Sequence, residues 1–356
     1  MASILYYVSG HGFGHAVRSA RVVRELSKLG HRCEIVSSAP RYIFDANLKE
    51  VTFGYHSSEC DPGVAQVDSL KNNIAETRNR WEKYLAQAEK WLDNGMRLCG
   101  ELKPSAIVSD TVPLACVLAR RAGAPSFLVT TFTWDWILDF YRDDDPAFIG
   151  IAAHVREWYQ LADNLIYTPF AYGLPDVRPA HKVSLIGKRA ALPKTELRRT
   201  FGLDGRPAFL VSFGGCGANG IEKMGVQKLE QYQFVFMGDE TRREGNRLTF
   251  SNGSAVHEDL LAACDAVITK PGYGVCTECT LNRTPMLYTT RGKFAEYDPL
   301  VREMQSYFPA VYIPQKELFN GGLGSYLENI PPFTPEHKTD SGTGAEEAAR
   351  PITAIL

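Results

Sequence analysis

The sequence predicts an α/β protein with two doubly wound parallel-sheet domains that face each other across a cleft. The chain has 356 residues, which is more than one hydrophobic core normally supports. Each half opens with an apolar strand that runs into a glycine-rich turn, at residues 9–16 and 214–218. Open α/β sheets bind ligands at the carboxyl ends of their strands, so two such turns predict one shared interdomain site.

We expect a first domain at residues 1–178, a second at 179–335 and a C-terminal tail at 336–356. The first boundary falls in a stretch rich in Pro and Gly, and a similar stretch precedes the tail. The tail is amphipathic enough to form a helix that packs back on the first domain, although Pro351 would kink it.

Apolar runs alternate with runs of helical period in the first half, which is typical of βαβ units. Strands are predicted at residues 3–8, 33–38, 105–109, 126–131 and 164–167, and helices at 17–29, 114–122 and 151–162. Residues 67–102 are predicted to form one long helical stretch, with a break near Asn94 and Gly95.

The second half repeats this alternation with shorter strands. They are predicted at residues 207–213, 233–237, 248–250, 266–269, 286–288 and 310–313. Helices are expected at residues 257–263, after the turn at 271–274, and at 299–307.

Composition and charge exclude several classes of protein. The formal net charge of −2 gives no global basic field for nucleic acid, and no apolar run is long enough for a membrane span. The N-terminus lacks a signal peptide, and the eight cysteines are scattered, so we expect a reducing cytoplasm. Cys276 and Cys279 form the one C-x-x-C pair, which we interpret as helix packing because no second pair has zinc-like spacing.

The first glycine-rich turn does not fit a dinucleotide site. Its glycines lie at positions 10, 12 and 14 rather than in G-x-G-x-x-G spacing, and the second strand ends in serines instead of an acid. The same turn contains His11 and His15, whereas a loop that binds pyrophosphate needs only its backbone N–H groups. Two histidines at the carboxyl edge of a sheet favour acid–base chemistry instead.

Residues 266–278 read as a buried strand, a glycine-bearing turn and a helix that carries one carboxylate, Glu278. A strand that leads through glycine into a helix N-terminus offers backbone N–H groups to an anion, most often phosphate. One helical turn further on, Glu278 is placed to reach a hydroxyl-rich part of the same ligand. Phosphate at one end and hydroxyls at the other indicate a nucleotide.

Residues 269–278 also resemble the donor-binding signature of the GT-B glycosyltransferases that use nucleotide-sugars. Lys270 stands where those enzymes often have a phosphate-binding histidine, and Tyr273 replaces a tryptophan. Gly272 and Glu278 match the turn glycine and the ribose-binding glutamate of the family. The resemblance implies the GT-B fold, with two Rossmann-like domains.

The first half carries the same resemblance. Gly14 and His15 are similar to the glycine–histidine pair of the family's first loop, where inverting members use the histidine as general base. Asp110 fits the aspartate that orients this histidine in plant-type members, although its position also suits an N-cap of the helix at 114–122. In the family the loop after the next strand grips the donor sugar, which implies this role for Glu296 and Asp298.

A closer resemblance is to the glycosyltransferase-like N-terminal domain of plant L-arabinokinases and related bacterial proteins, a domain of family 1 and family 28 type. It covers about residues 3–330. Three motifs carry it: SGHGFGHAVR at 9–18, KPGYGVCTE at 270–278 and FAEYDPLVREM at 294–304.

These observations lead us to expect a metal-independent, inverting glycosyltransferase that moves a hexose or pentose from a nucleotide-sugar to an acceptor hydroxyl. The catalytic candidates are His15 as base, Asp110 as its partner and His11, which is either the base itself or a ligand of acceptor or phosphate. The residues expected to bind the donor are Gly14, Gly214, Gly215, Lys270, Gly272, Tyr273, Gly274, Glu278, Glu296 and Asp298.

No cofactor or metal is expected, because the nucleotide-sugar, by family habit a UDP-sugar, is itself a co-substrate. The acidic run at residues 143–145 invites a metal interpretation, but it follows no clear strand and we interpret it as a solvated turn. A small molecule, a lipid and a modified nucleobase of nucleic acid all stay open as acceptors. Two other functions also stay open: a nucleotide-sugar epimerase of the same fold, and a non-catalytic sugar-nucleotide-binding protein.

Overall fold

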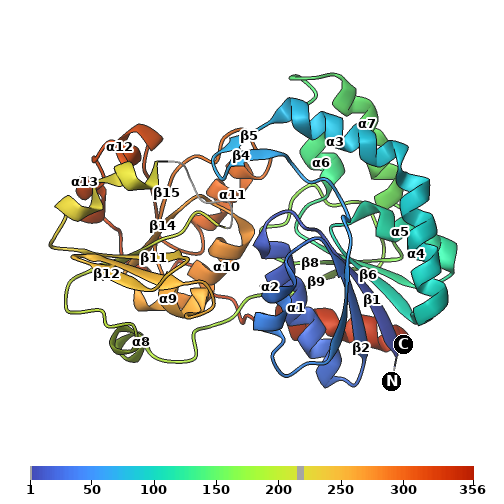
Figure 1. The fold of residues 1–356 in the computed structure, drawn as a ribbon, viewed down its shortest axis with the longest axis horizontal. Helices are drawn as coiled ribbons and strands as arrows, with labels where there is room; N and C mark the ends of the chain where they lie inside the picture. Colours follow the sequence, from blue (N-terminus) through green and yellow to red (C-terminus); the bar gives the residue numbers. More distant parts are fainter. Residues whose placement is uncertain (1, 215–219) are drawn as a thin grey trace.

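The computed structural model describes residues 2–214 and 220–356, which form two α/β domains (Figure 1). Each domain is built on a seven-stranded sheet, and helices pack on both sheets. The two-domain, parallel-sheet class predicted from the sequence is therefore confirmed. No helix in the described part of the chain combines the length and apolar character that a membrane crossing requires.

The first sheet is parallel throughout and has the strand order β3-β2-β1-β6-β7-β8-β9. Its strands are β1 (Ser3–Val8), β2 (Arg32–Ser37), β3 (Phe53–Ser57), β6 (Ala106–Asp110), β7 (Ser126–Thr130), β8 (Asn164–Tyr167) and β9 (Ala180–Lys182). The five strands predicted in this half are present. Strand β9 pairs with β8 and lies past the expected boundary at 178–179.

Helices pack on both faces of this sheet (Figure 1). They are α1 (Phe13–Lys28), α2 (Arg41–Asn47), α3 (Ile74–Ala86), α4 (Ala88–Leu102), α5 (Pro113–Ala122), α6 (Trp134–Asp139) and α7 (Ala147–Tyr159). Helix α1 begins four residues before the predicted start at Val17. The reason is that Gly12 takes a positive φ of 75° as the N-cap, which ends the turn early and places His15 inside the helix.

The prediction of one helical stretch at residues 67–102 is wrong at both its start and its break. A short hairpin of β4 (Gln66–Asp68) and β5 (Lys71–Asn72) comes first, and α3 and α4 meet at Gln87. Gly95 lies inside α4, where an added Cβ would come within 2.8 Å of Leu118. This glycine therefore permits close packing of α4 on α5 and does not break the helix.

The second sheet has the order β12-β13-β11-β10-β14-β15-β16, and its edge strand β12 is antiparallel. Its strands are β10 (Ala208–Val211), β11 (Gln233–Gly238), β12 (Arg242–Glu244), β13 (Arg247–Ser251), β14 (Ala266–Thr269), β15 (Met286–Tyr288) and β16 (Ala310–Tyr312). The helices of this half are α8 (Lys194–Thr200), α9 (His257–Ala263), α10 (Tyr273–Asn282), α11 (Tyr297–Met304), α12 (Gln315–Phe319) and α13 (Gly324–Leu327). Two short 3₁₀ helices, Ile221–Met224 and Val226–Lys228, follow β10.

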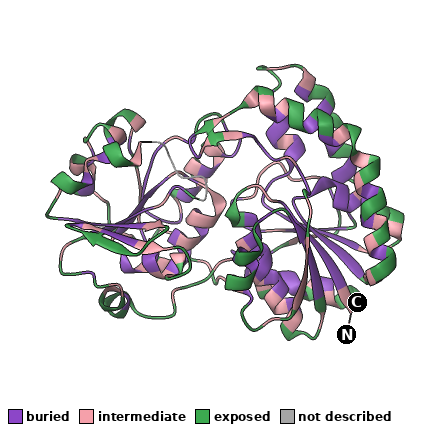
Figure 2. Ribbon diagram, viewed as in Figure 1, coloured by how far each residue is buried: buried purple, intermediate pink, exposed green. Residues whose placement is uncertain are grey.

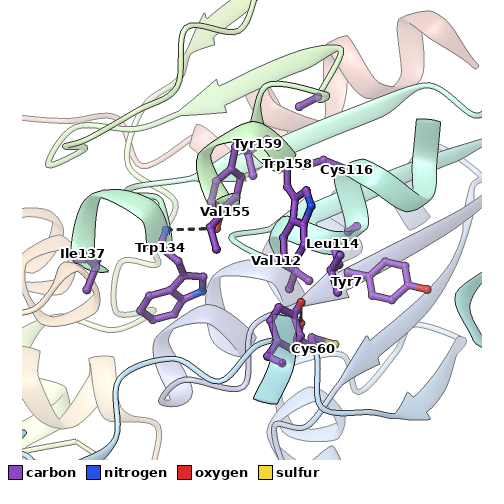
Figure 3. Packing of buried hydrophobic residues seen from close by; sticks show 14 of the residues in the cluster. Tyr7, Cys60, Val112, Leu114, Cys116, Trp134, Ile137, Val155, Trp158 and Tyr159 are labelled. Atoms are coloured by element: carbon purple, nitrogen blue, oxygen red, sulfur yellow. Dashed lines mark hydrogen bonds between the residues drawn. The ribbon is translucent and has the colours of Figure 1, made fainter. Parts of the chain in front are cut away.

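The central strands of both sheets are buried under these helices, whereas the edge strand β12 is exposed (Figure 2). In the first domain the core contains several aromatic side chains (Figure 3). There the Trp134 amide of α6 donates to the Tyr159 hydroxyl of α7 at 3.3 Å. Phe294, from the second half of the chain, belongs to the same cluster, so the two domains share part of this core.

The C-terminal helix α14 (Gly344–Ile355) packs on α1 of the first domain. Its buried side chains Ala348, Ala349 and Ile352 join the cluster of the first sheet. Helix α14 continues through Pro351. The end of the chain thus lies against its beginning, close to the N-terminus (Figure 1).

We predict that Ile352→Ala lowers the free energy of unfolding by about 2–5 kcal/mol, because it leaves a cavity under a side chain that is 0% exposed. The control is Ile355→Ala on the same helix, where the side chain is 49% exposed and the loss should stay below about 0.5 kcal/mol. Urea unfolding of both variants measures the difference. Equal losses would show that α14 does not contribute its buried face to the fold.

Candidate active site

Helices α1 and α10 contact each other at the boundary between the domains (Figure 1). Each helix follows the carboxyl end of a strand near the centre of its sheet, β1 for α1 and β14 for α10. The turns before the two helices are the ones that hold most of the predicted site residues. The fold therefore brings the two motif regions, which are about 260 residues apart in the sequence, to one place.

His15 and Asp110 are paired as the sequence predicts. Strands β1 and β6 are neighbours, and Asp110 lies beside Val8 at their carboxyl ends. The His15 Nδ1 atom lies 2.8 Å from Asp110 Oδ1, and both side chains are buried. An ionised carboxylate only accepts hydrogen bonds, so this contact favours the tautomer with the proton on Nδ1, while Arg18 Nη2 also lies 3.2 Å from the same nitrogen.

The alternative role of Asp110 as a helix N-cap is wrong. The N-cap of α5 is Val112, and this helix end has no side-chain cap. The carboxylate of Asp110 is instead directed at α1, where it accepts hydrogen bonds from Arg18 Nε at 3.0 Å and from Ser19 Oγ at 2.7 Å. Arg18 Nη2 contacts the other carboxylate oxygen as well.

Arg18 is a site residue that the sequence analysis missed. Its guanidinium also donates to Thr131 Oγ1 at 3.1 Å, and it lies 5.2 Å from the centre of the Tyr273 ring in the second domain. The available signal was its spacing, because a residue three positions after His15 lies on the same face of a helix. Arg18 thus connects the base candidate to the donor motif.

Burial by itself would raise the pKa of Asp110, but the positive charge of Arg18 and the contact with His15 outweigh it and hold the pKa well below its usual range. A depressed carboxyl pKa stabilises the fold above the unfolded value of about 4, and this contribution is lost as the pH falls through the folded value. Asp110 therefore stays ionised near neutral pH.

Thr111, the residue after Asp110, has a φ of 66°, although it is β-branched and fully buried. This backbone conformation costs about 1–3 kcal/mol for such a residue. Its hydroxyl donates to Asp110 Oδ1 at 3.2 Å and lies 2.9 Å from Thr130 Oγ1. The strained residue therefore helps to hold the carboxylate in the orientation that His15 and Arg18 use.

His11 lies between the domains. Its ring is edge-on to Trp134 at 5.2 Å and is stacked with Phe294 of the second domain at 6.4 Å. Burial lowers the pKa of His11 to about 3, and the neighbouring groups His15, Arg291 and Lys270 lower it further. His11 is therefore neutral near pH 7. The Asp110 carboxylate contacts His15, so the two histidines have different surroundings.

The predicted donor residues of the 266–278 stretch lie around the N-terminus of α10. Gly272 is its N-cap, Tyr273 and Gly274 begin the helix, and Lys270 is half-buried just after β14. This helix end offers backbone N–H groups to an anion, as the sequence predicts.

The other predicted donor glycines are distributed over both domains. Gly14 is exposed in the first turn of α1. Gly214 follows β10 with a φ of 78°, a conformation that favours glycine. Gly215 lies outside the described residues.

Glu278 is engaged by His257, a second residue that the sequence analysis did not assign to the site. His257 Nδ1 lies 2.6 Å from Glu278 Oε2, and its Nε2 lies 2.9 Å from Ser212 Oγ. Burial alone would lower the pKa of His257, but the charge and hydrogen bond of Glu278 outweigh it, so the pKa is raised. The sequence around His257 contains no pattern that predicts this contact, because the contact joins two separate helices, α9 and α10.

The two acidic residues predicted to grip the sugar have different environments. Glu296 is buried 3.3 Å from Arg291, whose guanidinium lies over the Phe294 ring at 3.9 Å. Asp298 is exposed in the first turn of α11. The fold brings Glu296, but not Asp298, into the buried cluster beside His11.

No group of three or more His, Cys, Asp or Glu side chains is arranged to hold a metal ion in residues 2–214 and 220–356. In the acidic run at 143–145, Asp144 pairs with Lys293 and Asp145 pairs with Arg78. Cys276 and Cys279 are buried as free thiols in α10, consistent with their interpretation as packing residues.

We predict that Arg18→Met destabilises the protein by about 3–5 kcal/mol, because it leaves the buried Asp110 carboxylate without its cation. The control is Arg121→Met, which removes the exposed pair with Glu89 and should cost less than about 1 kcal/mol. Chemical unfolding at neutral pH measures both. Similar small losses would mean that Asp110 is not ionised in the fold.

We predict that the His257–Glu278 pair stabilises the second domain more at about pH 6 than at about pH 9. A raised histidine pKa gives stability that is fully present below the unfolded value of about 6.5 and lost as the pH rises through the folded value. The difference in unfolding free energy between wild type and Glu278→Gln should shrink over this interval. A difference that does not change with pH would contradict the pairing.

Comparison with known proteins relates the chain to glycosyltransferases. Residues 2–133 match the family described as glycosyl transferase family 1. L-arabinokinase of Arabidopsis thaliana is 28% identical over 334 residues, which cover 93% of this chain and 32% of that protein. The chain thus spans about a third of the length of this relative.

Solved structures share the whole fold at low sequence identity. The calicheamicin glycosyltransferase CalG4 matches with a TM-score of 0.66 and 16% identity, over 100% of this chain and 98% of the other. Phytolacca americana UGT2, solved with UDP-2-fluoro-glucose and pterostilbene, matches with a TM-score of 0.59 and 15% identity, over 99% and 90%. The chain therefore has the GT-B glycosyltransferase fold, with a family 1 match in its N-terminal region and a distant similarity to L-arabinokinase.

Proposed function

We propose that the protein is an inverting glycosyltransferase that moves a sugar from a nucleotide-sugar to an acceptor hydroxyl, with His15 as general base. The observation that carries the proposal is the 2.8 Å contact between His15 Nδ1 and Asp110 at the domain boundary. It supports the tautomer in which Nε2 has a lone pair available for a proton. The donor motif lies across the boundary, with Tyr273 against the same Arg18 that holds Asp110.

In the proposed reaction, Nε2 of His15 takes the proton of the acceptor hydroxyl. The acceptor oxygen forms a bond to C1 of the sugar as the bond from C1 to the diphosphate oxygen breaks. Attack on the face opposite the leaving group inverts the configuration at C1. The nucleoside diphosphate leaves with the bonding electron pair, and the enzyme carries one additional proton on His15 until solvent removes it.

The diphosphate leaving group needs stabilisation by positive charge and N–H donors. We assign this to Lys270, to the backbone amides at the start of α10 and to Gly214. These groups make a metal ion unnecessary in the proposed mechanism. The N-terminal amides of α1, which include that of Gly14, add to the same positive potential.

We assign the donor to the second domain and the acceptor to the first. Glu278 binds the ribose hydroxyls through the carboxylate oxygen that His257 does not engage, and Glu296 and Asp298 contact the sugar. Uridine diphosphate is the proposed nucleotide, supported by the UDP-sugar analogue bound to the structural relative from Phytolacca americana. The sugar transferred is a hexose or a pentose.

A transfer assay tests the base. Nucleotide-sugars are first screened by thermal shift, and the best donor is then assayed against candidate acceptors with wild type, His15→Ala and the control His154→Ala. We expect His15→Ala to lower kcat by about 10²–10⁴-fold with donor affinity kept within about twofold, because only proton removal is lost. His154 is exposed on α7, and its replacement should leave kcat unchanged.

Transfer that survives in His15→Ala would disprove the base assignment. A metal requirement for wild-type transfer would disprove the metal-independent mechanism. Donor turnover in the absence of any acceptor would instead indicate the epimerase function, and donor binding without turnover would indicate a sugar-nucleotide-binding protein.

A further inference from the structure

Three side chains of the second domain form a hydrogen-bonded chain that joins β10, α9 and α10. His257 Nε2 lies 2.9 Å from Ser212 Oγ, and His257 Nδ1 lies 2.6 Å from Glu278 Oε2. Ser212 directly follows β10, and its carbonyl oxygen accepts a hydrogen bond from the hydroxyl of Thr269, the last residue of β14. The chain therefore lies at the carboxyl edge of the sheet, beside the turn that leads into α10.

The contacts of His257 suit both of its protonation states. In the protonated ring, Nδ1–H donates to the Glu278 carboxylate and Nε2–H donates to the Ser212 hydroxyl oxygen. In the neutral ring, the contact with the carboxylate favours the proton on Nδ1, and the Ser212 hydroxyl can donate to Nε2 instead. Titration of His257 therefore changes the charge beside Glu278 without a change of partners.

The charges around His257 favour its protonated form. Burial by itself would lower its pKa, but Glu278 of α10 and Glu258, the next residue along α9, outweigh burial and raise the pKa. Two further sets of ion pairs lie around α9: Arg21 of α1 with Glu258, and Lys194 and Arg198 of α8 with Asp265. Lysine, arginine and carboxylate groups keep their charges between about pH 6 and pH 9, so among these residues His257 is the one that changes charge.

An ionised carboxylate has two opposite effects on a nucleotide-sugar. It accepts hydrogen bonds from ribose hydroxyls, and it repels the negative charges of the diphosphate in the same molecule. A cation beside the carboxylate reduces this repulsion, because the formal charges of His257 and Glu278 then sum to zero. The carboxylate oxygen that His257 does not engage still accepts a hydrogen bond. The protonated pair therefore suits an anionic ligand with hydroxyl groups better than Glu278 alone.

We propose that His257 is a positioning residue for the donor, which orients the Glu278 carboxylate toward the ribose and, when protonated, offsets its charge. This inference rests on the proposed function, in which Glu278 binds the ribose. Ser212 fixes the other side of the imidazole ring, so the ring keeps its place while its charge changes. Donor binding and protonation of His257 favour each other, and by linkage each strengthens the other by the same factor.

Donor binding measured against pH tests the proposal. The probe is UDP-glucose, whose esterified diphosphate does not titrate between about pH 6 and pH 8.5, and calorimetry gives its dissociation constant for the full chain. We expect this constant to rise about tenfold over the interval in wild type, which corresponds to a shift of about one unit in the pKa of His257 when the donor binds. A rise below about twofold would overturn the proposal.

The decisive variant is His257→Asn, which keeps an N–H donor for Glu278 but has no titratable charge. Its binding should be weak and independent of pH, and a pH dependence equal to that of wild type would overturn the proposal. The matched control is His56→Asn. His56 Nε2 lies 2.9 Å from Glu34 Oε2 in the first domain, so this variant removes a similar pair at a different place. It should keep the wild-type pH dependence, and its loss would show that the effect is not specific to His257.

If His257→Asn does not fold, Ser212→Ala decides. Loss of the hydroxyl that accepts Nε2–H should lower the titration midpoint of His257, which NMR of labelled histidine follows without any donor. The midpoint of the pH profile for UDP-glucose binding should move by the same amount. A binding profile that does not follow the His257 midpoint would overturn the proposal.

The outcomes also separate this inference from the proposed function. Sugar transfer by an enzyme whose donor binding does not depend on pH would overturn the role of His257 and leave the proposed function intact. Donor binding that depends on pH through His257, in a protein that transfers no sugar, would support the role of His257 and disprove the transferase. Absence of nucleotide-sugar binding at every pH would overturn both.

Discussion

The buried ion pair of Asp110 and Arg18 is the interaction on which the rest of the site depends. Asp110 is 0% exposed at the end of β6, where an unpaired carboxylate would be strongly destabilising. Its pairing with Arg18 fixes α1 against the carboxyl edge of the sheet. The position of His15 on α1 follows from that contact, and so does the approach of the Arg18 guanidinium to Tyr273 in the second domain. One charge pair thus positions the proposed base and connects two domains.

The site belongs to both domains because several contacts cross the boundary beside it. Arg21 of α1 pairs with Glu258 of α9, the residue next to the histidine that holds Glu278. Asn72 of the short hairpin donates to the backbone oxygen of Lys293 at 2.8 Å, and Phe294 is buried in the core of the first domain. Movement of one domain relative to the other would therefore change the surroundings of the proposed base and of the proposed donor-binding residues together.

Much of the fold was predictable from the sequence, and the errors have local causes. Apolar strands such as β1 and β6 can be recognised in the sequence, because strands buried on both faces consist of near-continuous apolar residues. Strand β9, Ala-His-Lys, is too short and too polar to be recognised in this way. It forms a strand because it pairs with the edge of β8. The hairpin before α3 gives no clear signal for a similar reason: apart from Val67, the residues of its two strands are polar, and the strands pair only with each other.

The sequence by itself determined the two-domain α/β class, the glycine-rich turns and the residue types at their ends, because these follow from local periodicity and from the backbone needs of turns. Only the tertiary structure decided which charges meet. Arg18 lies 92 positions from Asp110 and Ser9 lies 52 positions from Asp61, while the His257 contact with Glu278 joins separate helices. Burial makes each of these contacts matter, since a charge in a low-dielectric interior must find a partner, and burial is a property of the packed chain.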